Sequence, residues 1–294
     1  MPVGDIVTSP EELVRGLAAE GYLAAEGLAT ALFCAIRLPQ PLLLEGEAGV
    51  GKTQAAKTLA SMLDTPLIRL QCFEGIDASE ALYEWNYPRQ LLGIRSAEAQ
   101  GKGMDEASLF GRDYLIERPL LQAIEHPGPR PAVLLIDEVD RADEEFEAFL
   151  FEMLAENTVT VPEIGTIEAK LAPVVVLTSN RTRDLHDALK RRCLYHWIEY
   201  PDLDQATAIV RARVPMASAD LTTGVAEAVQ RLRGLDVQKP PGIAEAIDWV
   251  QAAALLGLVS LDESGVERTL SSVLKYREDQ DLARAEGLAW VAGQ

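Results

Sequence analysis

The chain has 294 residues, of which 48% are hydrophobic, and a formal net charge of −19 at pH 7. This length predicts about two domains with a sizeable hydrophobic core, and the composition argues against a largely disordered chain. The acidic balance argues against sequence-independent nucleic-acid binding, which needs a basic surface, and against docking on an anionic membrane.

Two further features bear on location. The cysteines Cys34, Cys72 and Cys193 are scattered without a C-x-x-C pair, which is typical of buried free thiols in a reducing compartment. The chain opens without a secretory signal and contains no uninterrupted apolar run of about 18 residues. We therefore expect a soluble cytoplasmic protein with no transmembrane segment.

The first predicted elements lead to a glycine-rich loop. Ser9 followed by Pro10 predicts a helix start, and an Ala/Leu-rich helical segment extends to Arg37. An apolar run over 42–44 predicts a buried strand, and residues 54–63 have the apolar spacing of a helix. The loop between them matches the pattern G-x-x-x-x-G-K-[ST] and consists of Gly46, Glu47, Ala48, Gly49, Val50, Gly51, Lys52 and Thr53.

This loop is a candidate phosphate-binding site. Glycines let backbone N–H groups approach phosphate oxygens, and the start of the following helix adds a partial positive charge. We expect Lys52 to reach the β- and γ-phosphates and the Thr53 hydroxyl to bind Mg²⁺. The alternative is a glycine-rich turn that binds nothing, and the flanking strand and helix count against it.

The region after the glycine-rich loop contains a predicted insert. Residues 66–72 predict a second strand, and residues 76–82 predict a short helix. Aromatic residues at alternate positions over 83–87, with more apolar residues up to 95, predict a hairpin, which is either part of the core or a functional insert. Residues 96–112 are polar and predict a loop, and a helix follows over 118–124.

Two apolar strands end in polar residues. The strand predicted over 131–138 ends in Asp137 and Glu138, at the edge where ligands of parallel sheets bind. An aspartate there can hold the water shell of Mg²⁺, and a glutamate beside it can polarise an attacking water. The strand predicted over 173–180 ends in Asn180, which either caps a turn or senses the γ-phosphate through its amide.

The rest of the chain divides into a mixed and a helical part. A helix over 144–156 and a second hairpin over 158–167 lie between the two polar-ended strands. A short helix over 184–190 ends in Arg191 and Arg192, a pair that the helix dipole alone could also explain. We predict domains 1–200, with inserts near 83–112 and 158–168, and 201–294, with helices over 203–214, 221–232, 243–258 and 266–276.

Four motifs in this order, followed by helices, resemble an AAA+ ATPase: the loop 46–53, the pair Asp137-Glu138, the stretch Thr178-Ser179-Asn180 and the pair Arg191-Arg192. The resemblance implies an α/β fold: a P-loop core with a parallel sheet flanked by helices, and a C-terminal all-helical lid domain. The two hairpin candidates resemble the inserts of the MoxR branch. Within that branch, three stretches resemble CoxD-type proteins, namely 74–77, 83–90 and 187–193.

The resemblance implies a role for each matching residue. Lys52 and Thr53 match the Walker A motif, whereas Asp137 and Glu138 match the Walker B motif, and Asn180 matches sensor 1. These matches imply that ATP is bound with Mg²⁺, and that Thr53 and Asp137 hold the metal.

The resemblance also implies basic residues at two positions. Arg192 is the better match for the arginine finger, because Arg192-Cys193-Leu194 stands where the family has Arg-Phe-Leu, and Arg191 is the reserve. The family usually has an arginine at the start of a lid helix, but residues 240–244 contain none. Lys239 lies nearby and is the candidate replacement in the nucleotide site.

The resemblance also implies a function. It suggests an ATP-hydrolysing chaperone or remodelling motor, working as a hexameric ring with a partner that carries a von Willebrand factor A domain. CoxD-like proteins assist maturation of the molybdenum–copper centre of aerobic carbon monoxide dehydrogenase. The aromatic segment 83–87, with Trp85 at its centre, would then contact the client enzyme.

Three alternatives remain open at this point. An activase that remodels another enzyme, such as rubisco, would share every motif. A DNA-associated AAA+ protein is disfavoured by the acidic charge and by the absence of a Gly-Ala-Phe-Thr-Gly-Ala loop. A nucleotide-gated binding module without turnover is disfavoured by Glu138, because water activation needs a carboxylate at that position.

Overall fold

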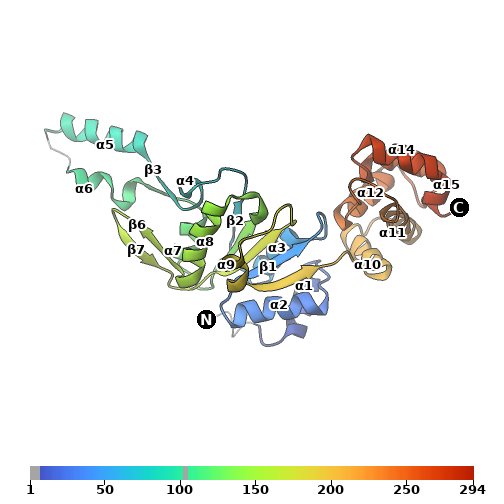
Figure 1. The fold of residues 1–294 in the computed structure, drawn as a ribbon, viewed down its shortest axis with the longest axis horizontal. Coiled ribbons are helices and arrows are strands. Elements are labelled where there is room, and N and C mark those ends of the chain that lie inside the picture. The colour runs from blue at the N-terminus through green and yellow to red at the C-terminus, as the bar shows by residue number, and fades with distance from the viewer. Residues whose placement is uncertain (1–6, 102–104) are drawn as a thin grey trace. The chain divides into compact units, whose positions relative to one another are not determined.

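The computed structural model describes residues 7–101 and 105–294, and the chain divides into two compact units (Figure 1). Unit 1 extends to Gly16 and also contains Ala25–Glu45 and Ala56–His196. Unit 2 contains Leu17–Ala24, Gly46–Ala55 and Trp197–Gln294. Within the described ranges, no helix combines the length and the apolar composition that crossing a bilayer requires.

The central feature of unit 1 is a five-stranded sheet in the order β2-β5-β8-β1-β9. The pairs β2–β5, β5–β8 and β8–β1 are parallel. Every residue of β1, β5 and β8 is buried, as expected for apolar parallel strands that are covered on both faces. The four strands predicted over 42–44, 66–72, 131–138 and 173–180 are thus present, as β1 (Leu42–Gly46), β2 (Leu67–Gln71), β5 (Val133–Asp137) and β8 (Val174–Ser179). The fifth strand of the sheet is β9 (Leu194–Ile198).

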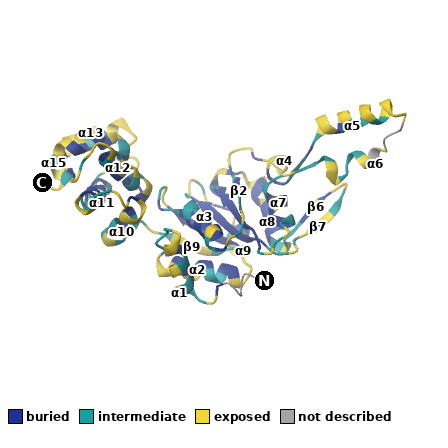
Figure 2. Cartoon of the chain, turned by 180° about the vertical axis from the view of Figure 1, so that it is seen from behind, coloured by how far each residue is buried: buried dark blue, intermediate teal, exposed yellow. Residues whose placement is uncertain are grey.

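Alternate residues of a strand point to opposite faces of the sheet, so these apolar strands have side chains on both faces that helices must cover. Leu43, Leu134 and Leu177 share one face and pack in a single cluster with helices α7 and α8. Helix α2 contacts β8. In Figure 2 the buried residues are dark blue, and they include the central strands and one side of several helices. The helices of the mixed part are α1 (Pro10–Ala19), α2 (Glu26–Arg37), α3 (Lys52–Met62), α4 (Ala78–Ala81), α7 (Pro119–Glu125), α8 (Glu144–Glu156) and α9 (Asp187–Arg192).

The first insert differs from the predicted hairpin. Strand β3 (Tyr83–Trp85) pairs antiparallel with β4 (Leu115–Glu117), and not with residues 91–95. Asn86 ends the strand and caps a helix, because its side-chain oxygen accepts a hydrogen bond from the Arg89 N–H at 3.0 Å. The predictions of a strand over 91–95 and a loop over 96–112 are therefore wrong. The intervening chain forms α5 (Tyr87–Ala99), α6 (Glu106–Leu109) and the 3-10 turn η2 (Arg112–Tyr114), and residues 102–104 lie outside the described ranges.

Trp85 belongs to the core of unit 1. Its side chain is 7% exposed, and its ring meets the rings of Phe110 and Tyr83 edge to face at 5.3 and 5.9 Å. The interpretation of Trp85 as an exposed client contact is therefore wrong, and the core interpretation is confirmed for this residue. Among the described residues of this insert, the exposed large apolar side chains are those of Tyr87, Leu91 and Leu92, all on α5.

The second predicted hairpin is present. Strands β6 (Thr158–Val161) and β7 (Gly165–Glu168) pair antiparallel, with Val159 opposite Ile167. Gly165 has a φ of +101°, a conformation that favours glycine and allows the chain to reverse. Both hairpin strands place apolar residues in the cluster that contains α7 and α8.

In unit 2, the chain from residue 203 is helical, as predicted. The helices pack around Trp249, which is fully buried and donates a hydrogen bond from Nε1 to Thr269 Oγ1 at 2.6 Å. The last two helices were not predicted, because α14 is strongly polar and α15 is only five residues long. The helices are α10 (Leu203–Arg213), α11 (Ala219–Arg233), α12 (Ile243–Leu255), α13 (Glu263–Val273), α14 (Arg277–Glu286) and α15 (Leu288–Ala292).

The two compact units do not follow the chain order. Gly46–Ala55 groups with the C-terminal helices, although it continues directly from β1. The division into domains 1–200 and 201–294 therefore stays a prediction.

Candidate functional site

The glycine-rich loop between β1 and α3 has the backbone that its sequence predicts. Gly49 and Gly51 have φ values of +80° and +96°, which side chains with a Cβ rarely adopt. Helix α3 begins at Lys52, so the loop delivers the chain directly into a helix N-terminus. Backbone N–H groups without intrahelical partners at such a terminus favour an anion.

Lys52 is folded into this loop. Its side chain is buried, and Nζ donates hydrogen bonds to the carbonyl oxygens of Gly46 and Glu47, both at 2.7 Å. These carbonyls compensate the burial of the ammonium group. The result is a positive charge held at the inner side of the loop by its own main chain.

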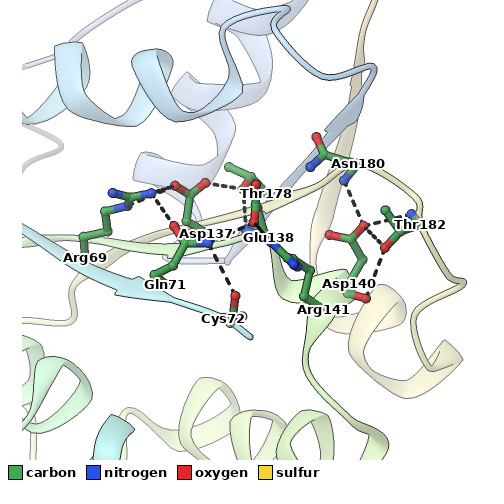
Figure 3. A network of polar contacts seen from close by, with 10 residues as sticks. All are labelled: Arg69, Gln71, Cys72, Asp137, Glu138, Asp140, Arg141, Thr178, Asn180 and Thr182. Atoms are coloured by element: carbon green, nitrogen blue, oxygen red, sulfur yellow. Dashed lines mark hydrogen bonds and ion pairs between the residues drawn. The ribbon is translucent and has the colours of Figure 1, made fainter. Parts of the chain in front are cut away.

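Asp137 ends β5 and is fixed by side chains from both neighbouring strands (Figure 3). On one side, the Thr178 hydroxyl donates a hydrogen bond to Oδ1 at 2.6 Å. On the other side, Arg69 donates to Oδ2 from Nη2 at 2.6 Å and from Nε at 3.0 Å. The Asp137 side chain is only 3% exposed, so the guanidinium and the hydroxyl replace the water that its charge has lost.

Glu138 follows Asp137 in a left-handed conformation, with φ 55° and ψ 49°. Its backbone N–H donates to the Thr178 hydroxyl oxygen at 2.9 Å, which fixes this conformation. Its Oε2 accepts hydrogen bonds from Gln71 Nε2 at 3.0 Å and from Arg141 Nη1 at 3.1 Å. The carboxylate is therefore held beside Asp137 by β2 on one side and by the short helix η3 (Val139–Arg141) on the other.

Asn180, directly after β8, is joined to the same edge through Asp140. The Asp140 side chain is buried, and its Oδ2 accepts from the backbone N–H groups of Asn180 at 3.2 Å and Thr182 at 2.8 Å. The Thr182 hydroxyl donates to the same oxygen at 2.7 Å. Asp140 thus fixes the turn that carries Asn180, as Figure 3 shows.

Besides Arg141 and Thr182, the network contains four residues that were not predicted from the sequence as site residues. Arg69 and Gln71 lie on β2, Thr178 lies on β8, and Asp140 follows the strand end of β5. Only the sheet order, in which β5 lies between β2 and β8, brings them together. The pattern D-E-x-D over 137–140 is a visible signal for Asp140, and Thr178 stands in the stretch 178–180 that resembles the family. No local signal marks Arg69 or Gln71.

The remaining sequence-predicted residues take no part in the hydrogen bonds of this network. Arg191 and Arg192 end α9 and are both exposed, and the Arg192 guanidinium lies 4.6 Å from the centroid of the Phe151 ring on α8. Lys239 is exposed in the segment between α11 and α12, and its backbone N–H donates to Asp279 Oδ2 at 3.3 Å.

Unit 2 also contains a pocket of about 280 Å³ between the start of α10 and the face of α11. Its walls combine an aromatic ring, small apolar side chains and two polar side chains, a mixture that suits a flat, partly polar ligand. The lining residues are Tyr200, Pro201, Leu203, Ala206, Ala226, Gln230 and Arg233.

Cys72 and Cys193 lie close to the candidate residues in sequence, and both are poorly suited to reaction. Burial raises the pKa of each thiol to about 12, and nearby carboxylates, led by Asp137, add to the effect at Cys72. The thiolate, which is the reactive form, is therefore scarce at neutral pH. All three cysteines of the chain are free.

Comparisons with known proteins agree with this geometry. The sequence profile of the AAA domain (dynein-related subfamily) matches residues 41–193, which is more than half of the chain. Two relatives are the uncharacterized protein SERP0979 of Staphylococcus epidermidis and the uncharacterized protein SH1500 of Staphylococcus haemolyticus. Each is 25% identical over 87% of this chain, and the alignments cover 92% and 91% of these relatives.

Solved structures support the fold. A point mutant of RuvB from Thermotoga maritima superposes with a TM-score of 0.50 and 16% identity, over 91% of this chain and 71% of that one. A “putative ATPase” of Cytophaga hutchinsonii has the same TM-score and identity, over 95% of this chain and 90% of its own. With its P-loop, its parallel five-stranded sheet and its C-terminal helices, the chain belongs to the AAA domain (dynein-related subfamily) family of AAA+ ATPases.

Proposed function

We propose that this protein is a MoxR-type AAA+ motor that hydrolyses ATP to remodel a client enzyme in the cytoplasm. The observation that carries the proposal is the set of side chains at one sheet edge. Asp137, Glu138 and the turn of Asn180 are linked by hydrogen bonds there, on strands parallel to the one that runs into the P-loop. This combination of groups suits the binding and hydrolysis of a nucleoside triphosphate.

The P-loop supplies the phosphate-binding half of this proposal. The N–H groups of residues 46–53 and the N-terminus of α3 would face the phosphates, and the Lys52 ammonium would exchange its carbonyl partners for phosphate oxygens. The pocket beside Tyr200 would take the base, because its aromatic and small apolar walls suit a flat ring.

The residues present also fit a magnesium ion. Hard oxygen ligands suit Mg²⁺, and it commonly binds through one or two protein side chains together with substrate phosphates. Thr53 and Asp137 would hold it, and Arg69 now supplies the positive charge that the Asp137 carboxylate requires. When bound, Mg²⁺ would neutralise charge on the β- and γ-phosphates.

Glu138 is proposed as the group that activates water. Water attacks the γ-phosphorus, the bond from that phosphorus to the β–γ bridging oxygen breaks, and ADP leaves. Glu138 accepts the proton that the attacking water loses. The Asn180 amide would hold the γ-phosphate, and Asp140 would keep the Asn180 turn in place.

The proposed assembly is a homo-oligomeric ring, with a hexamer as the expected form, and turnover depends on it. Arg192, with Arg191 as the reserve, would reach the nucleotide of a neighbouring subunit and stabilise charge on the transferred phosphoryl group. Both are exposed on α9 and are therefore accessible to a neighbour. Lys239 remains the proposed replacement for the lid arginine.

The proposed client is aerobic carbon monoxide dehydrogenase during maturation of its molybdenum–copper centre, with a von Willebrand factor A domain protein as partner. The support is the resemblance of stretches 74–77, 83–90 and 187–193 to CoxD-type proteins. Within the insert, the exposed apolar side chains of Tyr87, Leu91 and Leu92 are the candidates for the contact with the client.

The test has two parts. ATP hydrolysis and ATP binding are first compared for the wild type and Glu138→Gln, which keeps the size of the side chain but cannot accept the proton. Binding should be retained and turnover should fall by about 10²–10⁴-fold. Equal turnover would exclude Glu138 as the base, and no hydrolysis by the wild type would exclude the motor function.

The second part identifies the client. The protein and ATP are added to carbon monoxide dehydrogenase that lacks a mature centre and, separately, to inhibited rubisco. ATP-dependent gain of carbon monoxide oxidation supports the proposed client, whereas reactivation of rubisco alone supports the activase alternative.

A further inference from the structure

The P-loop contains a residue whose charge opposes its proposed ligand. Glu47 is the second residue of the loop, and its carboxylate is half exposed. A carboxylate beside a polyphosphate repels it, and the repulsion is large where protein excludes water. The loop therefore needs a cation beside Glu47 in addition to Lys52.

Arg233 at the end of α11 meets this need within unit 2. Its Nη2 lies 2.6 Å from Glu47 Oε2, although 186 residues separate the two in sequence. Only 17% of the Arg233 side chain is exposed, compared with 52% for Glu47. The pair is thus shielded on the arginine side, and the charge of Glu47 is compensated before a nucleotide arrives.

Two further contacts fix the direction of Arg233. Its Nη1 donates to the Pro241 carbonyl oxygen at 2.9 Å, and its guanidinium carbon lies 3.9 Å from the centroid of the Tyr200 ring. A planar guanidinium can make an ion pair, a main-chain hydrogen bond and a ring contact together, which a lysine cannot reproduce. Arg233 also lines the pocket proposed for the base.

The start of α12 holds the same loop at a second point. The Ala244 N–H donates to the Gly49 carbonyl oxygen at 3.3 Å. A Cβ on Gly242 would lie 2.9 Å from both the Ala48 carbonyl oxygen and Gly49 Cα, so this close approach depends on glycine. The segment from Arg233 to Ala244 therefore contacts the first half of the P-loop at both of its ends.

We infer that Arg233 is a positioning residue of the P-loop. By pairing with Glu47 it neutralises a carboxylate of the phosphate-binding loop, and it ties the end of α11 to that loop. The inference rests on the proposed nucleotide binding and adds to it a lid arginine that acts through Glu47. Arg233 acts on the loop in addition to Lys239, which remains the proposed replacement for the arginine at the start of α12.

The test uses Arg233→Gln, Glu47→Gln and the double variant, with Arg213→Gln as the matched control. Arg213 is an exposed arginine at the end of the neighbouring helix α10. Affinities for ADP and for the non-hydrolysable analogue AMP-PNP are measured by calorimetry. Arg233→Gln should weaken ADP by about tenfold and AMP-PNP by more, because the uncompensated carboxylate repels the larger charge more strongly.

The double variant carries the decisive result. Removing the Glu47 charge should restore both affinities to within about threefold of wild type, because no repulsion then remains. If the double variant binds as weakly as Arg233→Gln, the arginine acts on the nucleotide directly and the inference is overturned. Normal binding by Arg233→Gln alone would overturn it as well.

A second measurement needs no nucleotide. Hydrogen exchange of backbone amides over 46–51 and 242–246 should be faster in Arg233→Gln and in Glu47→Gln than in wild type or Arg213→Gln, because the tie is lost. Unchanged exchange would overturn the tie. If the wild type binds neither ligand, the proposed function fails, and this measurement still decides whether Arg233 holds the loop.

Discussion

The P-loop and the acidic sheet edge hold their charged residues in different ways. Lys52 is held by carbonyl oxygens only five and six residues away, those of Glu47 and Gly46. Asp137 and Glu138 are held mainly by side chains of other strands, which lie 40 to 68 residues away in the sequence, and Arg141 adds one local contact to Glu138. One group is built by local conformation and the other by the order of strands in the sheet.

This difference has a physical consequence. The P-loop geometry requires only a few glycine conformations and a helix start, so a short sequence can specify it. The acidic edge requires β2, β5 and β8 to be neighbours, so its geometry depends on the whole sheet. Substitutions in the two regions should accordingly separate binding from turnover.

The largest expected effect concerns a contact between subunits, beyond the local contacts of the P-loop and the contacts between strands. Arg192→Ala should lower turnover by about 10³–10⁵-fold while ATP binding stays near wild type, because the guanidinium acts only on the transferred phosphoryl group. Mixed with inactive Glu138→Gln subunits, it should regain activity, because some interfaces then pair an intact Glu138 with an intact Arg192. Turnover is measured on mixed rings whose composition has been verified.

Three results would count against a finger that acts between subunits. They are no regain of activity in mixed rings, loss of ATP binding by Arg192→Ala, and full activity of that variant. Arg191→Ala is the matched control for the full-activity case, because Arg191 lies beside Arg192 and is also exposed. If both variants are active, the pair serves the helix dipole of α9.

The next effect concerns the insert, where the contacts of Trp85 are also distant in sequence. Trp85→Ala should destabilise the fold by about 3–5 kcal/mol, because it removes a large side chain from the core. Leu92→Ala, at a side chain that is 67% exposed, should change stability by less than about 0.5 kcal/mol. Thermal unfolding of the two variants checks this contrast.

The same pair separates folding from client recognition. Leu92→Ala should impair client activation while basal turnover is retained, if α5 contacts the client. An unfolding temperature of Trp85→Ala equal to that of wild type would contradict its place in the core.

Lys52→Ala tests the P-loop, whose geometry is built by local conformation. Losing a buried charged partner costs about 2–5 kcal/mol, so ATP affinity should fall by about 30-fold or more. Calorimetry with ATP checks this, and Lys57→Ala on the same helix is the control for a general loss of positive charge. Equal affinities of Lys52→Ala and wild type would remove the P-loop assignment.

The smallest expected effect lies in the region built by the sheet. Gln71→Ala removes one hydrogen bond from the Glu138 carboxylate and frees lone pairs that can accept the proton of water. Basal turnover should rise by up to about fivefold, which corresponds to one hydrogen bond of about 1 kcal/mol. A steady-state assay at saturating ATP measures it, and a fall in turnover would mean that Gln71 aims Glu138 productively.

The features that the sequence could predict are those built by local conformation, and those built by neighbouring elements could not be predicted. The strands, the P-loop, the hairpin β6–β7 and the helical character of the C-terminal part could be predicted, because each depends on local patterns. The pairing of β3 with β4 could not, because residues 87–114 intervene and Asn86 caps a helix inside the stretch 83–87, whose alternation predicted a strand. The partners of Asp137, and the pairing of Arg233 with Glu47, likewise depend on which elements become neighbours.

The left-handed backbone of Glu138 has an evolutionary consequence. A residue other than glycine costs about 1–2 kcal/mol in this conformation, so glycine would make the folded chain more stable here. Selection for thermostability alone would therefore remove the carboxylate, whereas selection for turnover keeps it. An unusually heat-stable descendant of this chain that has lost its activity would be expected to carry a substitution at position 138.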